Sequence, residues 1–115
     1  MAIYWMLQSL KLSDNRKFKT IDKDTFSNLK NLKKLKIEFS YELTELQPEL
    51  FSNLGNLEEL DLTLMNLTHF DLKIFNYIVN IKKINLCDRS LKNKEEILDH
   101  LKKSNIKFSF EDFDE

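Results

Sequence analysis

Few residues in this chain could perform covalent or metal chemistry. The chain has two histidines, His69 and His100, and one cysteine, Cys87. A metal site needs several ligands at suitable spacing, and neither histidine has such a set, so the sequence predicts no metal site. His100 follows Glu96 by four residues, which predicts a surface ion pair on one helical face. Cys87 could be a reactive thiol, but a free cysteine is more often an inert, small residue.

The composition excludes several further classes of function. The 115 residues include one glycine and one proline and carry a formal net charge of -1. Phosphate-binding loops need several glycines, and a single cysteine forms no internal disulfide and no zinc site of paired cysteines. Balanced charge disfavours a nucleic acid partner, and no apolar run approaches the roughly 20 residues that cross a bilayer. We therefore predict a non-catalytic protein without a cofactor and without nucleic acid or membrane contact.

The elements that position the remaining polar residues come from an internal repeat. Units open at Leu7, Leu32, Leu57 and Ile81, at spacings of 25, 25 and 24 residues. Each unit has apolar residues at its first, fourth and sixth positions, and the last two alternate as in a short strand with one buried face. A later Phe-x-x-Leu or Phe-x-x-Ile step is typical of a loose helical turn packed under the strand. Stacked units would bury a continuous apolar core.

This pattern resembles the leucine-rich repeat family, and in particular its 24-residue class, which is common in the ectodomains of Toll-like receptors. The resemblance extends from about Leu7 to Leu91. It implies an α/β fold, namely a horseshoe-shaped solenoid with a short parallel sheet on its concave face. It also implies a protein-recognition function, although the family binds many unlike partners.

The ninth position of the unit departs from the family pattern. In the family, an asparagine at this position bonds backbone groups of the turn and of the neighbouring units. Here the four units carry, in order, Asn15, Ser40, Met65 and Arg89. Ser40 could partly replace asparagine, and Asn66 could do so if the strand end slips by one residue. We expect a less regular convex side in the later units.

We assign residues 1–110 to a single leucine-rich-repeat domain and the acidic residues 111–115 to a solvated tail. Residues 93–110 form a helix–strand cap. The helix is expected to begin after Asn93, with Glu96 three residues later as in a capping box. The strand that follows is indicated by alternating apolar residues at positions 106, 108 and 110.

The N-terminal end shows no comparable cap. The first unit begins at Leu7, and no polar helix or cysteine-rich segment precedes it. An uncovered repeat end exposes apolar surface and unpaired strand groups. Either the chain is a piece of a longer array, or a partner covers this edge, and we expect association through it.

The outward side chains of the strands are the candidate partner contacts. Charge alternates between units at equivalent positions, which could either fix the sheet register or offer a docking strip. Phe39 and Leu64 occupy the eighth position of adjacent units and could either anchor a partner or fold over the sheet edge. The candidate partner-binding residues are Phe39, Leu64, Tyr41, Lys34, Lys36, Glu59, Asp61 and Lys83.

The sequence thus predicts a non-catalytic protein–protein recognition module. The resemblance implies a receptor-like or innate-immune fragment, and the alternative is an intracellular scaffold or regulatory adaptor that binds a protein through its concave face. The protein would be cytoplasmic if the chain is complete and extracellular if it is a fragment of a receptor-type array. In the second case the triplet that begins at Asn66 would be available as a glycan acceptor.

Overall fold

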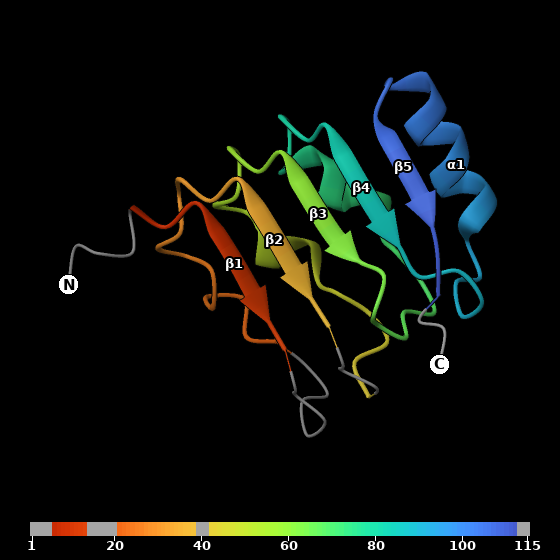
Figure 1. The fold of residues 1–115 in the computed structure, drawn as a ribbon, viewed down its shortest axis with the longest axis horizontal. Coiled ribbons are helices and arrows are strands. Elements are labelled where there is room, and N and C mark those ends of the chain that lie inside the picture. Colours follow the sequence, from red (N-terminus) through yellow and green to blue (C-terminus); the bar gives the residue numbers. More distant parts are fainter. Residues whose placement is uncertain (1–5, 14–20, 39–41, 113–115) are drawn as a thin grey trace.

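The computed structural model describes residues 6–13, 21–38 and 42–112 (Figure 1). Its five strands form one parallel sheet in chain order: β1 (Ser9–Leu12), β2 (Lys34–Ile37), β3 (Glu59–Leu62), β4 (Lys83–Leu86) and β5 (Lys107–Phe110). The chain returns between strands through 3₁₀ helices η2 (Pro48–Phe51) and η3 (Leu72–Asn76) and through helix α1 (Lys94–Lys103). This arrangement confirms the predicted solenoid. Four residues with sequence-based predictions lie outside the described ranges: Asn15, Phe39, Ser40 and Tyr41.

The sheet register follows the repeat. Leu10 lies opposite Leu35, Leu35 opposite Leu60, Leu60 opposite Ile84, and Ile84 opposite Phe108. Equivalent side chains therefore form one column across the sheet, with neighbours about 4.8 Å apart. The middle of this column is buried, since Leu35 and Leu60 are 2% and 1% exposed, whereas Leu10 is half-buried and Phe108 is 37% exposed. The core is complete in the middle units and thinner at both ends.

The segments that return behind the sheet carry the predicted aromatic step. Phe26, Phe51 and Phe75 are buried in the same core as the strand leucines. Pro48 opens η2, where its missing N–H costs no hydrogen bond. The helical turns lie behind the sheet, which leaves its opposite side uncovered (Figure 1). Each strand is therefore buried on one face only, which is the face that packs against these turns.

Asparagines join neighbouring units, but at a different position from the one that the family pattern implies. Asn56 Nδ2 donates to the carbonyl of Lys30 at 2.8 Å, and Asn80 Nδ2 donates to the carbonyl of Gly55 at 2.7 Å. Asn56 and Asn80 each precede the first residue of a unit, and each bonds the preceding unit. An asparagine ladder is therefore present at the junctions between units.

At the ninth position no asparagine acts in this way among the described residues. Met65 is buried in the core, and Asn66 is exposed, so the slip that would bring Asn66 inward does not occur. Main-chain bonds link the units on this side instead. Thr68 N–H donates to the Thr44 carbonyl, and Lys92 N–H donates to the Thr68 carbonyl, both at 2.9 Å.

The C-terminal helix and strand form as predicted, but the helix is not capped as predicted. Helix α1 buries Ile97 and Leu101 completely. The Asn93 side chain accepts from Phe70 N–H at 3.1 Å and donates to the Phe70 carbonyl at 2.7 Å, and it caps no backbone N–H of its own helix. Glu96 accepts from Asn93 Nδ2 at 2.7 Å. The expected capping box does not form, because the side-chain amide of Asn93 pairs with both backbone groups of Phe70 instead.

The end of α1 directs the chain into the last strand. Asn105 has a φ of 56°, in the left-handed region that asparagine tolerates better than most residues. Ile106 N–H then bonds the Leu101 carbonyl at 3.2 Å, as in a Schellman motif. This turn sets β5 in parallel register beside β4.

The asparagine ladder predicts a specific loss of stability. The double substitution Asn56→Ala/Asn80→Ala should lower the free energy of unfolding by about 1–2 kcal/mol, because two bonds between units are lost. Urea unfolding followed by circular dichroism measures this difference. The control is Asn66→Ala, which removes an exposed amide with no hydrogen bond in the described structure and should cost less than about 0.5 kcal/mol. Equal losses in both variants would contradict a ladder at the junctions.

Candidate protein-binding surface

The uncovered side of the sheet carries all five charged candidates. We call this side the strand face and define it by Lys34, Lys36, Glu59, Asp61 and Lys83. Lys34 lies opposite Glu59, Glu59 opposite Lys83, and Lys36 opposite Asp61. Each of these side chains alternates along its strand with a buried leucine or isoleucine. The structure therefore brings the five residues together on one face.

Opposite charges on neighbouring strands form ion pairs along this face. Lys34 Nζ lies 3.8 Å from Glu59 Oε2, and Lys36 Nζ lies 3.8 Å from Asp61 Oδ2. The Lys34 side chain is 63% exposed and the Lys36 side chain is 39% exposed, so water screens both pairs and each contributes only a few tenths of a kcal/mol. The pairs add a weak preference for the register that burial of the leucines already imposes.

Glu38 lies on the side of the strand face, as its place in the strand alternation predicts, but it is not exposed. Although it follows β2 directly, it is only 4% exposed. Its Oε1 lies 3.2 Å from Lys11 Nζ and its Oε2 lies 3.7 Å from Lys36 Nζ. Lys11 and Lys36 are opposite each other in the sheet, and like charges in register repel. The carboxylate covered by the two lysines compensates this repulsion.

Leu64 is half-buried at the end of β3, so it is neither fully exposed nor fully covered. It lies beside a hollow of about 510 Å³ on the strand face, together with Lys36, Asp61 and Lys83. Phe39 and Tyr41, the two aromatic candidates, lie outside the described residues. Leu64 is thus the apolar candidate that the structure places next to the charged ones.

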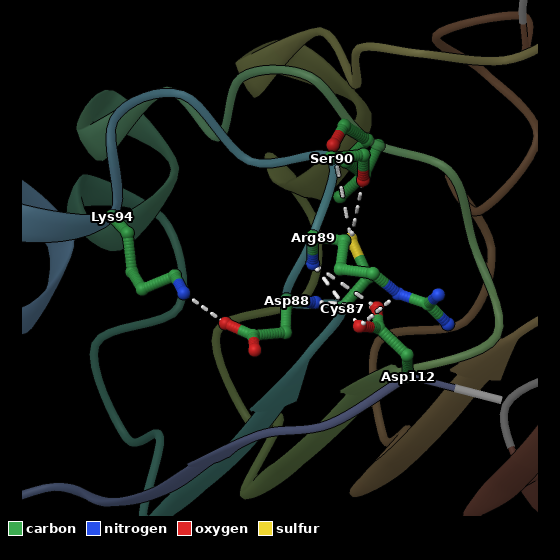
Figure 2. A network of polar contacts seen from close by, with 7 residues as sticks. Cys87, Asp88, Arg89, Ser90, Lys94 and Asp112 are labelled. Atoms are coloured by element: carbon green, nitrogen blue, oxygen red, sulfur yellow. Dashed lines mark hydrogen bonds and ion pairs between the residues drawn. The ribbon is translucent and has the colours of Figure 1, made fainter. Parts of the chain in front are cut away.

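The alternation of side chains along β4 predicts that Cys87, one residue beyond the strand, faces outward, and this prediction is wrong. The thiol is 1% exposed, with Sγ 3.8 Å from the Leu67 carbonyl oxygen and 3.5 Å from Ser90 Oγ (Figure 2). The chain turns after β4, and this turn moves the small side chain into the core. The polar groups that contact Sγ are a carbonyl and a hydroxyl, which fits the interpretation of Cys87 as an inert, small residue of the core.

Asp112 replaces the missing ninth-position asparagine in the fourth unit (Figure 2). Its Oδ1 accepts from the N–H groups of Asp88 and Arg89 at 2.9 and 3.2 Å, and its Oδ2 lies 2.9 Å from Arg89 Nε. Lys94 forms an ion pair with Asp88 beside it. Asp112 was expected in a solvated tail, but its carboxylate instead forms hydrogen bonds that stabilise the turn after β4.

Two opposing effects act on the pKa of the Asp112 carboxyl. Partial burial raises it, whereas the hydrogen bonds from Asp88 and Arg89 and the Arg89 charge lower it. The lowering effects together are stronger, so the pKa lies below the ordinary aspartate value. The folded structure therefore favours the ionised carboxylate.

The family of the protein follows from its repeat. The leucine rich repeat model matches residues 6–63 and 31–90, which include β1 to β4 and the turns between them. The chain belongs to the leucine-rich repeat family. A search of the curated proteins gave no match. Leucine-rich-repeat domains generally mediate protein–protein interaction and are typically non-catalytic.

His100 of this leucine-rich-repeat domain does not form the predicted surface ion pair. The His100 ring stacks on Phe75, with centroids 4.3 Å apart, and its Nε2 lies 3.4 Å from Ser104 Oγ. The predicted ion pair with Glu96 is wrong, because Glu96 instead bonds Asn93. Within the described ranges, no three histidine, cysteine or acidic side chains are grouped to hold a metal, and no helix is long and apolar enough to span a membrane.

Strand β5 extends the leucine-rich-repeat strand face beyond the predicted candidates. Lys107 lies opposite Lys83, and Ser109 lies opposite Asn85, whose Oδ1 accepts from Ser109 Oγ at 2.7 Å. Lys107 was not among the candidates, because the sequence assigned its strand to the cap. The sequence spacing could have identified Lys107, because it follows Lys83 by one repeat length of 24 residues.

The depressed pKa of Asp112 predicts a pH-dependent contribution to stability. The contribution is complete above the unfolded pKa, near 4, and is lost as the pH falls through the lower folded pKa. Asp112→Asn should therefore lower the free energy of unfolding by about 1 kcal/mol at pH 7 and by less at pH 3. Urea unfolding at both pH values measures this. Asp99→Asn removes an exposed carboxylate on α1 as the control, and a similar pH-dependent loss there would contradict the role of Asp112.

Proposed function

We propose that this leucine-rich-repeat domain binds a protein partner through the strand face. The observation that carries the proposal is a continuous, hollowed surface of charged side chains that includes the half-buried Leu64. Short strands with a buried opposite face hold these side chains at constant spacing. Such a surface suits recognition, because rigid elements position binding residues better than loops do.

Mixed charge on the strand face supports a protein partner over other ligands. Glu59 and Asp61 lie between the lysines of β2 and β4, so the face is not a uniform cationic surface. A nucleic acid would require a continuous positive surface for its phosphates. A protein surface can instead match alternating charges and fill the hollow beside Leu64 with an apolar side chain.

Two versions of this function use the same face. A receptor-like or innate-immune role would place the protein outside the cell, and an intracellular scaffold or regulatory adaptor would remain within it. Asn66 distinguishes the two, because its exposed side chain is accessible to glycosylation on a secretory route. A glycan at Asn66 in the native protein supports the receptor-like role, and an unmodified Asn66 supports the adaptor.

The N-terminal edge of the sheet is a second proposed contact. Leu7, Leu10, Leu12 and Ile21 pack on the core but are only partly buried, unlike their equivalents in the middle units. A further unit or a second molecule covering β1 would complete their burial. We expect the sedimentation coefficient of the purified chain to rise with concentration. A value that stays monomeric up to millimolar concentration contradicts this contact.

Substitution of Leu64 tests the strand face as the binding surface. A photo-crosslinking amino acid at Thr63 would first capture the partner, whose affinity is then measured with purified proteins. Leu64→Ser should weaken binding about 5- to 10-fold, as expected for an apolar contact near the centre of an interface. Phe39→Ser/Leu64→Ser should weaken it further.

Val79→Ser is the matched control for Leu64→Ser. Val79 is 70% exposed and lies outside the strands, so its loss removes a similar apolar side chain from another surface. It should leave the affinity unchanged. Equal affinities for Leu64→Ser and the unsubstituted protein would contradict the strand face as the binding surface.

A further inference from the structure

Two lysines lie directly opposite each other on the last two strands of the sheet. Lys83 on β4 and Lys107 on β5 are in register, and both side chains are exposed. In the described part of the chain, neither ammonium group has an ion-pair partner or a side-chain hydrogen bond. Like charges directly opposite each other destabilise a sheet. The repulsion between Lys83 and Lys107 therefore destabilises the sheet, and no contact of the described chain offsets it.

The same chain shows how such a repulsion is relieved elsewhere. Lys11 and Lys36 are also opposite each other, and both contact the buried carboxylate of Glu38, at 3.2 and 3.7 Å. Lys36 further pairs with Asp61. The first like-charged pair is thus neutralised by acids of the chain itself, whereas the second pair is left without such an acid.

The nearest described acids do not serve Lys83 and Lys107. Glu59 lies opposite Lys83 in the sheet, but its carboxylate pairs with Lys34 on the other side, at 3.8 Å. Glu111 occupies the position after β5 that Glu38 occupies after β2, yet it lies four residues beyond Lys107. Glu111 borders the same hollow as the two lysines, but in the described part of the chain it forms no ion pair with either of them.

The lysine pair borders the hollow of about 510 Å³ that also contains Leu64 and Ser109. We propose that Lys83 and Lys107 bind carboxylates of an acidic peptide segment in the partner protein. The proposal rests on the proposed function and names the partner chemistry for the C-terminal half of the strand face. Charge complementarity carries it, because the anion would supply for this pair what Glu38 supplies for Lys11 and Lys36.

The distance between neighbouring strands predicts how the carboxylates are spaced along the acidic peptide segment. Adjacent strands are about 4.8 Å apart, and alternate residues of an extended peptide are about 7 Å apart, so two flexible lysines can reach carboxylates at positions i and i+2. Asp61 and Glu111 border the same hollow, so its positive charge is confined to a few lysines, which suits two carboxylates better than a continuous run of phosphates. An apolar residue beside the carboxylates would meet Leu64.

The test uses the full chain and three synthetic dodecapeptides. The peptides are identical apart from three alternate positions, which carry glutamate, glutamine or lysine. Fluorescence anisotropy at low and physiological salt should show binding of the glutamate peptide at least 5-fold tighter than that of the other two. Amide shifts in a ¹⁵N-labelled sample should concentrate on β4 and β5.

The decisive variant is Lys83→Gln/Lys107→Gln, with Lys92→Gln/Lys102→Gln as the charge-matched control. Both control lysines are exposed and lie outside the sheet. The first variant should weaken binding of the glutamate peptide at least 5-fold, and the control should change it less than 2-fold. Equal weakening in both, or tighter binding of an oligonucleotide of the same charge, would overturn the proposal.

A second readout is independent of any ligand. Lys107→Gln alone should raise the unfolding midpoint by about 1–3 °C at low salt, because it removes the repulsion, and by less at high salt. An unchanged or lower midpoint at low salt would overturn the argument from repulsion. If the unsubstituted chain does not prefer the glutamate peptide, while Leu64→Ser still weakens binding of the captured partner, this inference is overturned and the proposed function remains in place.

Discussion

The structure depends on the stacking of units that cannot bury their own apolar side chains. Each unit offers one short strand and one helical turn, and its leucines reach full burial only between two neighbours. Leu35 and Leu60, in middle units, are almost inaccessible, whereas Leu10 and Phe108 at the two ends are not. Register is consequently strict, because a slip by one residue would turn the buried leucines outward.

Strict register has a cost on the opposite side of the sheet. Stacking places equivalent side chains beside one another, so lysines repeated at one position of the unit meet lysines. The chain relieves one such meeting, between Lys11 and Lys36, with Glu38, and it avoids another by placing Glu59 between Lys34 and Lys83. The pair of Lys83 and Lys107 remains without relief. Electrostatic features of the strand face thus follow from the same stacking that builds the core.

The repeat, strands, helical turns and terminal helix could be predicted, because each depends on apolar spacing that is visible along the chain. Four local features could not be. Glu38 is buried by lysines from two strands, Cys87 by the turn after β4, and Asn93 bonds a residue 23 positions earlier. His100 stacks on Phe75 of the preceding segment. Each outcome depends on a contact between units, which sequence spacing alone does not contain.

By itself, the sequence determined the class of fold and the set of residues on the strand face, because periods of two and of about 24 residues dictate which side chains can be buried together. Only the tertiary structure decided which polar groups satisfy one another. Among the described residues, it joined neighbouring units through the side chains of Asn56, Asn80 and Asp112, and it left Lys83 and Lys107 facing each other. The physical reason is that hydrogen bonds and charge pairs depend on distances of a few ångströms, which arise only when neighbouring units are in place.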